Sequence, residues 1–189
     1  MIVKLTRSGD ARSGSGKSRM TVSPDPVPKS TPDHEIILVP PVGQSGREQL
    51  LQECYDVRID VFHHEQGYSP DVVIDKLRLP SFYPSVITKA YFPLPRRLDE
   101  TAEQFLLRLL PSLRPIGTVR VSRGSSGGGA PYYKLGRLAV LKEFRNHNFG
   151  GKLVLALHKW VAVDAQSRGE HSAKVICHSQ APVKAFYVK

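Results

Sequence analysis

The sequence has little cysteine and no long apolar run. Its 189 residues include two cysteines, Cys54 and Cys177, too few for a disulfide framework and without metal-ligand spacing. No stretch of about 18 apolar residues could span a membrane, and the first residues lack the apolar centre of a signal peptide. These absences predict a cytoplasmic protein with no metal and no membrane contact; the nucleus stays open, and mitochondria are less favoured.

Positive charge is in excess, and part of it is concentrated at the beginning of the chain. The net charge of +10 suits nucleic acid, an acidic protein surface or a phosphorylated ligand. Residues 1–33 combine basic side chains with Ser, Gly and Pro and hold few apolar anchors, which predicts a disordered basic tail. Residues 34–189 then form one domain, with an irregular, Pro- and aromatic-rich insertion near 77–97.

Apolar periodicity predicts alternating strands and helices in that domain. Ser45 and Glu48 form an S-x-x-E pattern, typical of the capping box that starts a helix. The stretch 105–110 fits either a helix or a strand, and the Gly cluster at 124–129 predicts a hairpin connection. We expect strands at 35–39, 116–122, 132–141 and 174–178, and helices at 46–62, from 149 to between 165 and 168, and around 185–187.

The most informative segment joins the strand at 132–141 to the helix that follows it. The loop between them, residues 145–151, contains Asn148, Gly150 and Gly151, which can take tight backbone angles. Since the N–H groups of a helix start face such a loop, the layout is that of a phosphate-binding turn. An anionic cofactor is its expected occupant.

Four motifs resemble those of the GNAT acyltransferase superfamily. Arg145, Asn148 and Gly150 take the places of the loop pattern R/Q-x-x-G-x-G/A, with Asn for the first Gly. Residues 115–120 resemble the family's third strand, and Phe186-Tyr187 its F-Y pair on the fourth helix. The pattern R-x-x-V-F-x-x-E-Q at the end of the first helix is matched by Arg58, Val61, Phe62, Glu65 and Gln66. The four motifs occur in the family's order across residues 34–189.

The resemblance implies a fold and a co-substrate. The expected fold is a three-layer α/β domain with a mixed sheet of the acyl-CoA N-acyltransferase type, lacking the last one or two strands because the chain stops at Lys189. The strand at 174–178 would then have an uncovered edge. Acetyl-CoA would be the co-substrate, held by Leu138, Ala139, Val140, Arg145, Asn146, His147, Asn148, Phe149, Gly150, Gly151 and Lys152.

The implied reaction is direct attack of a primary amine on the thioester. A backbone N–H near Val140 would stabilise the oxyanion, and Tyr187 would protonate the departing thiolate. His64 and Glu65 are acceptor-site candidates, although they could equally be structural. A Tyr packed beside a Phe is the corresponding structural alternative for Tyr187.

Other functions stay open at this point. An inactive acetyl-CoA-binding or protein-interaction module would keep the loop around Arg145 and lack a complete acceptor pocket. Nucleic-acid binding is disfavoured because no aromatic-basic motif accompanies the charge. The acceptor could be a small-molecule amine or a protein amino group, and a homodimer is an open alternative to a monomer.

Overall fold

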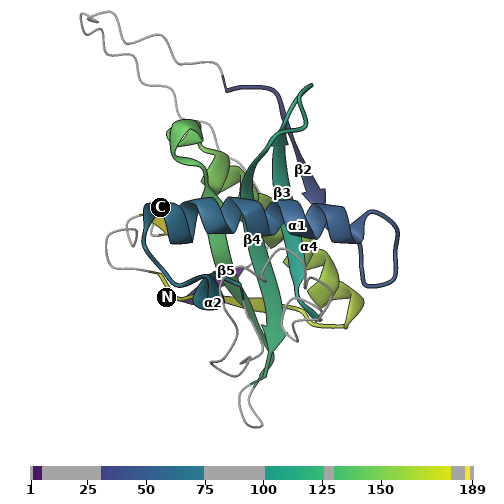
Figure 1. The fold of residues 1–189 in the computed structure, drawn as a ribbon. Helices are drawn as coiled ribbons and strands as arrows, with labels where there is room; N and C mark the ends of the chain where they lie inside the picture. Colours follow the sequence, from purple (N-terminus) through teal and green to yellow (C-terminus); the bar gives the residue numbers. More distant parts are fainter. Residues whose placement is uncertain (1, 6–30, 75–100, 126–129, 180–185, 188–189) are drawn as a thin grey trace, which may run out of the picture.

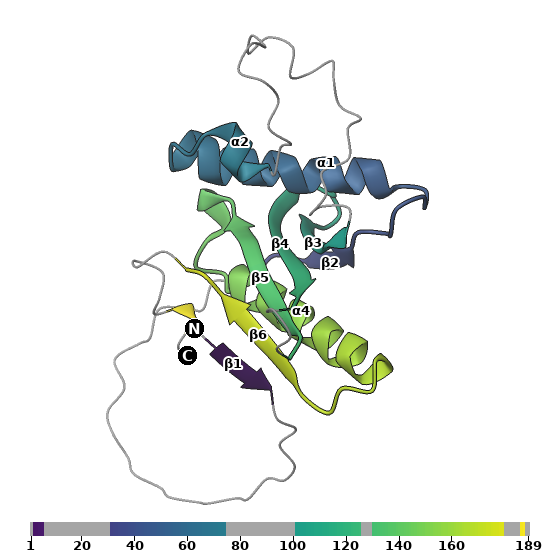
Figure 2. The ribbon, with the colours of Figure 1, turned by 90° about the horizontal axis from the view of Figure 1, so that it is seen from below.

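A six-stranded mixed sheet forms the centre of the protein (Figures 1 and 2). The computed structural model describes residues 2–5, 31–74, 101–125, 130–179, 186 and 187. The strand order is β1-β6-β5-β4-β3-β2, and every neighbouring pair is antiparallel except β5 with β6. The strands are β1 (Ile2–Leu5), β2 (His34–Leu38), β3 (Glu103–Leu109), β4 (Pro115–Gly124), β5 (Tyr132–Val140) and β6 (Ala173–Cys177).

Helices cover both faces of the sheet, which confirms the expected three-layer α/β architecture. Figure 2 shows α1 on one face and α4 on the other. Among the described residues, no helix is both long and apolar enough to cross a membrane. The helices are α1 (Arg47–Arg58), which continues as the π-helix η1 (Ile59–Glu65), the short α2 (Pro70–Val73), the 3-10 turn η3 (Lys142–Phe144) and α4 (Phe149–Ser167).

Polar contacts as well as apolar ones hold α1 on the sheet. Side chains alternate along β3, so Gln104, Leu106 and Arg108 share the face under α1. Leu106 is fully buried against this helix, Arg58 donates to the amide oxygen of Gln104, and Arg108 pairs with Glu53 at 2.6 Å. The position of α1 is therefore fixed by specific partners on β3.

The opposite face carries the main apolar core, which α4 covers. Leu153, Leu157 and Val161 follow one another at four-residue spacing and have no exposed surface. Leu153 approaches β4 closely: a Cβ at Gly117 would lie only 3.1 Å from its Cδ1 atom. The start of α4 therefore rests directly on the backbone of β4.

Two expectations about the beginning and the edge of the sheet are wrong. Residues 2–5 of the expected disordered tail form β1, which pairs antiparallel with β6 from Ile2↔Ile176 to Leu5↔Ala173. The edge of β6 is therefore covered by a strand from the other end of the chain. No local pattern could have indicated a partner so distant in the sequence.

The first helix also begins differently from its expected start. Gly46, with a φ of 78°, is the N-cap residue, and no side-chain cap bond is present, so Ser45 and Glu48 do not form a capping box. In the ambiguous segment 105–110, residues 105–109 are strand, as part of β3, and Leu110 begins the turn that follows. The insertion near 77–97, the tip of the glycine loop at 126–129 and most of the final helix lie outside the described residues.

Candidate functional site

The beginning of β5 pairs with the last residues of β6. Their parallel ladder joins Tyr133↔Val175, Lys134↔Ile176 and Leu135↔Cys177, and no later residue of β5 has a partner on β6 within the described part of the chain. β6 ends at Cys177, whereas β5 continues to Val140 (Figure 2). The second half of β5 therefore presents backbone polar groups on the side beyond the end of β6, which we call the opening.

The last residues of β5 direct an N–H group into the opening. Leu141 N–H donates to the carbonyl oxygen of Ile116 on β4 at 2.9 Å. Because successive N–H groups of a strand point to opposite sides, the N–H of Val140 points away from β4, toward the β6 side. This is the group expected at an oxyanion. Leu138, Ala139 and Val140 thus lie on the part of β5 that has no partner on β6 among the described residues.

The loop after η3 brings the start of α4 beside the same opening. Asn146 and Asn148 take positive φ values of 70° and 58°, so the left-handed geometry expected at Asn148 is confirmed. The first intrahelical bond runs from Lys152 N–H to Asn148 O at 3.0 Å, and no side chain caps the helix. The N–H groups of residues 149–151 consequently have no acceptor within the helix, and no acidic side chain lies in its first turn.

Phe186 and Tyr187 link this helix start to the end of β6. A Cβ at Gly150 would lie 3.2 Å from Cζ of Phe186, so the ring packs on the loop because that position is glycine. The rings of Phe186 and Tyr187 meet edge to face, with centroids 4.9 Å apart. The Tyr187 hydroxyl forms a side-chain hydrogen bond with the Cys177 thiol.

The environment of Tyr187 keeps its phenol protonated. Burial, followed by the neighbouring Cys177, raises the pKa of Tyr187 above the usual value of 10.0. Burial also raises the pKa of the Cys177 thiol, which the Tyr187 hydrogen bond opposes. A neutral phenol can supply a proton to a departing thiolate, for which Tyr187 would exchange its hydrogen bond to Cys177 for one to the leaving sulfur. The proximity of Cys177 was not expected.

Two residues assigned to the cofactor loop turn toward β2. Lys152 Nζ lies 3.1 Å from Nε2 of His34, and the Phe149 ring meets the His34 ring edge to face at 5.1 Å. The His147 ring packs against the same Phe149 ring, with the two centroids 5.8 Å apart. Any contact of Lys152 with a bound acetyl-CoA would therefore compete with its contact with His34. Sequence reasoning did not single out His34.

The acceptor-site candidates lie at the end of η1. Glu65 makes two hydrogen bonds with Arg145, at 2.6 and 2.5 Å, and the side-chain hydrogen bond from Arg145 lowers the pKa of the Glu65 carboxyl. A carboxylate with a lowered pKa is a poor general base at neutral pH. His64 is exposed, and its ring lies 4.9 Å from that of His63. The general base therefore stays unassigned.

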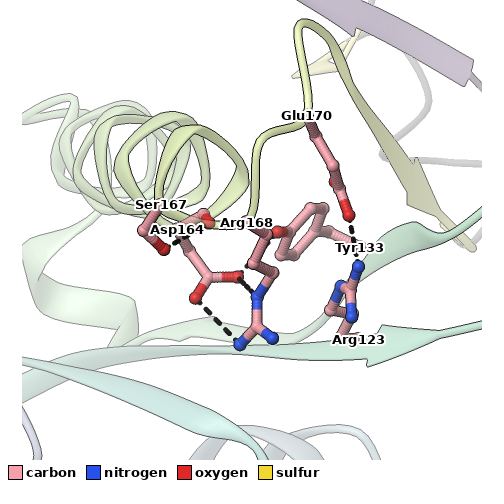
Figure 3. Close-up of polar contacts among 6 residues, drawn as sticks. All are labelled: Arg123, Tyr133, Asp164, Ser167, Arg168 and Glu170. Atoms are coloured by element: carbon pink, nitrogen blue, oxygen red, sulfur yellow. Dashed lines mark hydrogen bonds and ion pairs between the residues drawn. The ribbon is translucent and has the colours of Figure 1, made fainter.

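A separate polar cluster fixes the far end of α4 (Figure 3). The Tyr133 hydroxyl donates to Asp164 Oδ2 at 2.7 Å, Arg168 donates to both oxygens of Asp164, and Arg123 pairs with Glu170. Burial and the hydrogen bond to Asp164 raise the pKa of Tyr133 to about 12. This cluster lies at the opposite end of α4 from the loop, so we interpret it as structural.

Taken together, residues from four separate parts of the chain meet at one end of the sheet. The loop at 145–151 contacts the end of β5 and, through Arg145, Glu65 of η1, while Phe186 and Tyr187 connect the loop to the end of β6. Within the described residues, no group of three or more His, Cys, Asp or Glu side chains could hold a metal ion. The arrangement offers backbone N–H groups to an anion and a phenol to a leaving thiolate.

Solved structures share this architecture. No family model and no curated protein matches the sequence. A protein of Lactobacillus plantarum assigned as an N-acetyltransferase is 23% identical to this chain and superposes on it with a TM-score of 0.52. The alignment covers 82% of each of the two chains. A protein of Pyrococcus furiosus assigned as an acetyltransferase is 11% identical over 82% of this chain and 90% of its own, with a TM-score of 0.51. The chain therefore has the acyl-CoA N-acyltransferase fold of the GNAT N-acetyltransferases.

Proposed function

We propose that the protein is a GNAT-superfamily N-acetyltransferase that uses acetyl-CoA. The observation that carries the proposal is the end of the β5–β6 ladder at Leu135 and Cys177, which leaves the second half of β5 without a partner on β6 among the described residues, beside the uncapped start of α4. A helix N-terminus attracts phosphate groups, and an opened strand pair exposes amide groups to which a pantetheine arm can bond. The loop sequence and the position of Phe186-Tyr187 support the same assignment.

In the proposed mechanism, backbone groups bind the donor and orient its thioester. The N–H groups of residues 149–151 receive the diphosphate, and the edge of residues 138–140 that is not paired with β6 receives the pantetheine amides. The N–H of Val140 stabilises the oxyanion as the amine nitrogen bonds to the acetyl carbon. The acceptor is a primary amine, and small amines and protein amino groups are both candidates.

Collapse of the adduct breaks the carbon–sulfur bond and leaves a thiolate. Tyr187 donates its proton to that sulfur, and its raised pKa keeps the proton available at neutral pH. The proton lost by the amine leaves to solvent or to a base, for which Glu65 is unsuited because Arg145 holds it as a carboxylate of lowered pKa.

Calorimetry with acetyl-CoA, followed by thiol release with a panel of amines, tests the proposal. We expect binding and amine-dependent release, with release falling about 10²-fold or more in Tyr187→Phe while donor affinity stays near wild type. Tyr133→Phe is the matched control, because it removes a hydroxyl at the other end of α4.

Each other outcome has a definite meaning. Binding of acetyl-CoA without release for any amine would favour the inactive-module alternative over catalysis. Absence of binding would refute the proposal altogether. Unchanged turnover in Tyr187→Phe would remove Tyr187 from the mechanism while leaving the reaction class intact.

A further inference from the structure

The guanidinium of Arg145 joins three separate elements. Its Nη1 and Nη2 atoms donate to Oε1 and Oε2 of Glu65, at 2.6 and 2.5 Å. Its Nε atom donates to the carbonyl oxygen of Val140, at 3.0 Å. One side chain from the loop therefore contacts both the last residue of η1 and the last residue of β5. All three of its nitrogen atoms have a protein partner.

This geometry disagrees with a direct role for Arg145 in holding the donor. A guanidinium bonded in a bidentate manner to a carboxylate has most of its charge compensated and its donors directed away from other anions. These bonds engage Nε–H and one N–H of each Nη, which is three of the five N–H donors of the guanidinium. Arg145 therefore has only single N–H groups on Nη1 and Nη2 to offer a phosphate, and a bidentate grip through Nε would require release of Val140. The backbone N–H groups at the start of α4 need no such rearrangement.

The elements on either side of the ion pair are themselves well anchored. Val61, one turn before Glu65, is buried in the main core, and the chain after η1 is closed by a bond between His63 Nδ1 and the carbonyl oxygen of Tyr68. β5 is paired with β4 up to Val140. The loop at 145–151 is thus tied, through Arg145, to two rigid neighbours.

We propose that Glu65 and Arg145 are positioning residues for the acyl donor, which hold the loop so that its backbone N–H groups, and not the Arg145 side chain, bind the diphosphate. This inference rests on the proposed function. It assigns Glu65 to the donor half of the site, in place of the acceptor role expected from the sequence.

The positioning role and the loss of charge alone predict opposite changes in acetyl-CoA affinity for the substitution Glu65→Gln. Glu65→Gln removes a negative charge near the expected diphosphate, and charge alone would make donor binding tighter. Loss of the bidentate ion pair would instead loosen the loop and weaken donor binding. We expect the dissociation constant for acetyl-CoA to rise about threefold to thirtyfold, the range in which residues acting through their neighbours alter a site.

Glu143→Gln is the matched control for charge. Glu143 lies on η3, just before the loop, and pairs with Arg114 at 2.6 Å, with both side chains about half exposed. The substitution makes the same change in net charge without touching Arg145. We expect the affinity of Glu143→Gln for acetyl-CoA to stay within about twofold of wild type, because the substitution leaves all three bonds of Arg145 in place.

Substitution of Arg145 separates its geometry from its charge. Lysine keeps the positive charge but cannot make the three directed bonds, so Arg145→Lys should lose about as much donor affinity as Arg145→Gln. The double variant Glu65→Arg/Arg145→Glu should recover part of the loss, since the pair is reversed. Urea unfolding of these variants checks that each is folded where binding is measured.

Calorimetric titration of the full chain with acetyl-CoA gives the decisive readings. A dissociation constant for Glu65→Gln equal to or below those of wild type and Glu143→Gln would overturn the positioning role. Wild-type affinity in Arg145→Lys together with loss in Arg145→Gln would show that Arg145 acts by charge, which also overturns it. If wild type itself fails to bind acetyl-CoA, the proposed function falls first and this inference falls with it.

Discussion

Replacing Gly117 with alanine tests how closely α4 must lie on β4. The added Cβ would stand 3.1 Å from Cδ1 of Leu153 and 3.3 Å from the carbonyl oxygen of Ala139. Leu153 has no exposed surface and Ala139 contributes backbone, so neither atom has room to withdraw. Overpacking of this kind lowers the free energy of unfolding by about 1–3 kcal/mol. For a chain of this size, Tm falls by roughly 2–4 °C for each kcal/mol.

A second substitution shows whether that contact is the cause. Leu153→Ala alone leaves a cavity and should cost about 2–5 kcal/mol. In Gly117→Ala/Leu153→Ala, the new methyl group enters part of the vacated space. The double variant should therefore be more stable than the sum of the two losses implies, by about 1 kcal/mol or more.

Urea unfolding of the four proteins, followed by circular dichroism, measures these values. Losses that add to within about 0.3–0.5 kcal/mol would refute the packing argument, because contacting residues should couple. So would an unchanged midpoint in Gly117→Ala. Because Leu153 lies just after the loop glycines, we also expect Gly117→Ala to weaken acetyl-CoA binding where the protein is still folded.

Further predictions concern the polar cluster on α4 and the edge strand. The pKa of Tyr133 is raised from 10.0 to about 12, so its neutral form stabilises the fold: the contribution is complete below pH about 10 and is lost as the pH rises toward about 12. Thermal melts between pH about 10 and about 12 should show that the Tm of wild type falls more steeply with rising pH than the Tm of Tyr133→Phe. The hydrogen bond from Arg168 lowers the pKa of Asp164 below the ordinary value of 3.8. The ionised Asp164 therefore stabilises the fold above that pH, and this stabilisation is lost as the pH falls through the lowered pKa. The stability advantage of wild type over Asp164→Asn should vanish in acid, and an advantage that grows there would contradict the assignment. Deletion of residues 1–5 should expose the edge of β6 and cause concentration-dependent association in light scattering, and a variant that stays monomeric at all concentrations would show that β1 does not protect this edge.

Sequence reasoning succeeded where the determinants are local. The strand ending at Val140, the left-handed Asn148 and the apolar face of α4 all depend on residues within one or two turns of each other. Their periodicity and turn chemistry therefore predicted both the elements and the loop that joins them. Most of the ambiguous run at 105–110 is a strand because it pairs with β2 on one side and β4 on the other. This tertiary pairing outweighs the helix propensity of leucine.

The failures share a different cause. Glu65 and Arg145 lie far apart in the sequence, and neither residue shows by itself that it is bonded to the other. Ser45 had the right spacing for a capping box, yet the backbone at Gly46 is left-handed and the cap bond is not made. The π-helical turn at the end of the first helix likewise carries no periodic signature. Partners set by tertiary structure have no local pattern to detect.

The pairing of β1 with β6 also bears on the order in which the sheet is assembled. Ile2 pairs with Ile176, so this ladder closes a loop of nearly the whole chain, whereas β3, β4 and β5 pair with close neighbours in sequence. Closing so long a loop is entropically costly and yields contacts on one edge only. During synthesis β1 leaves the ribosome before the other strands of the sheet, yet it can dock only after β6 exists, and we expect it to be the last strand added.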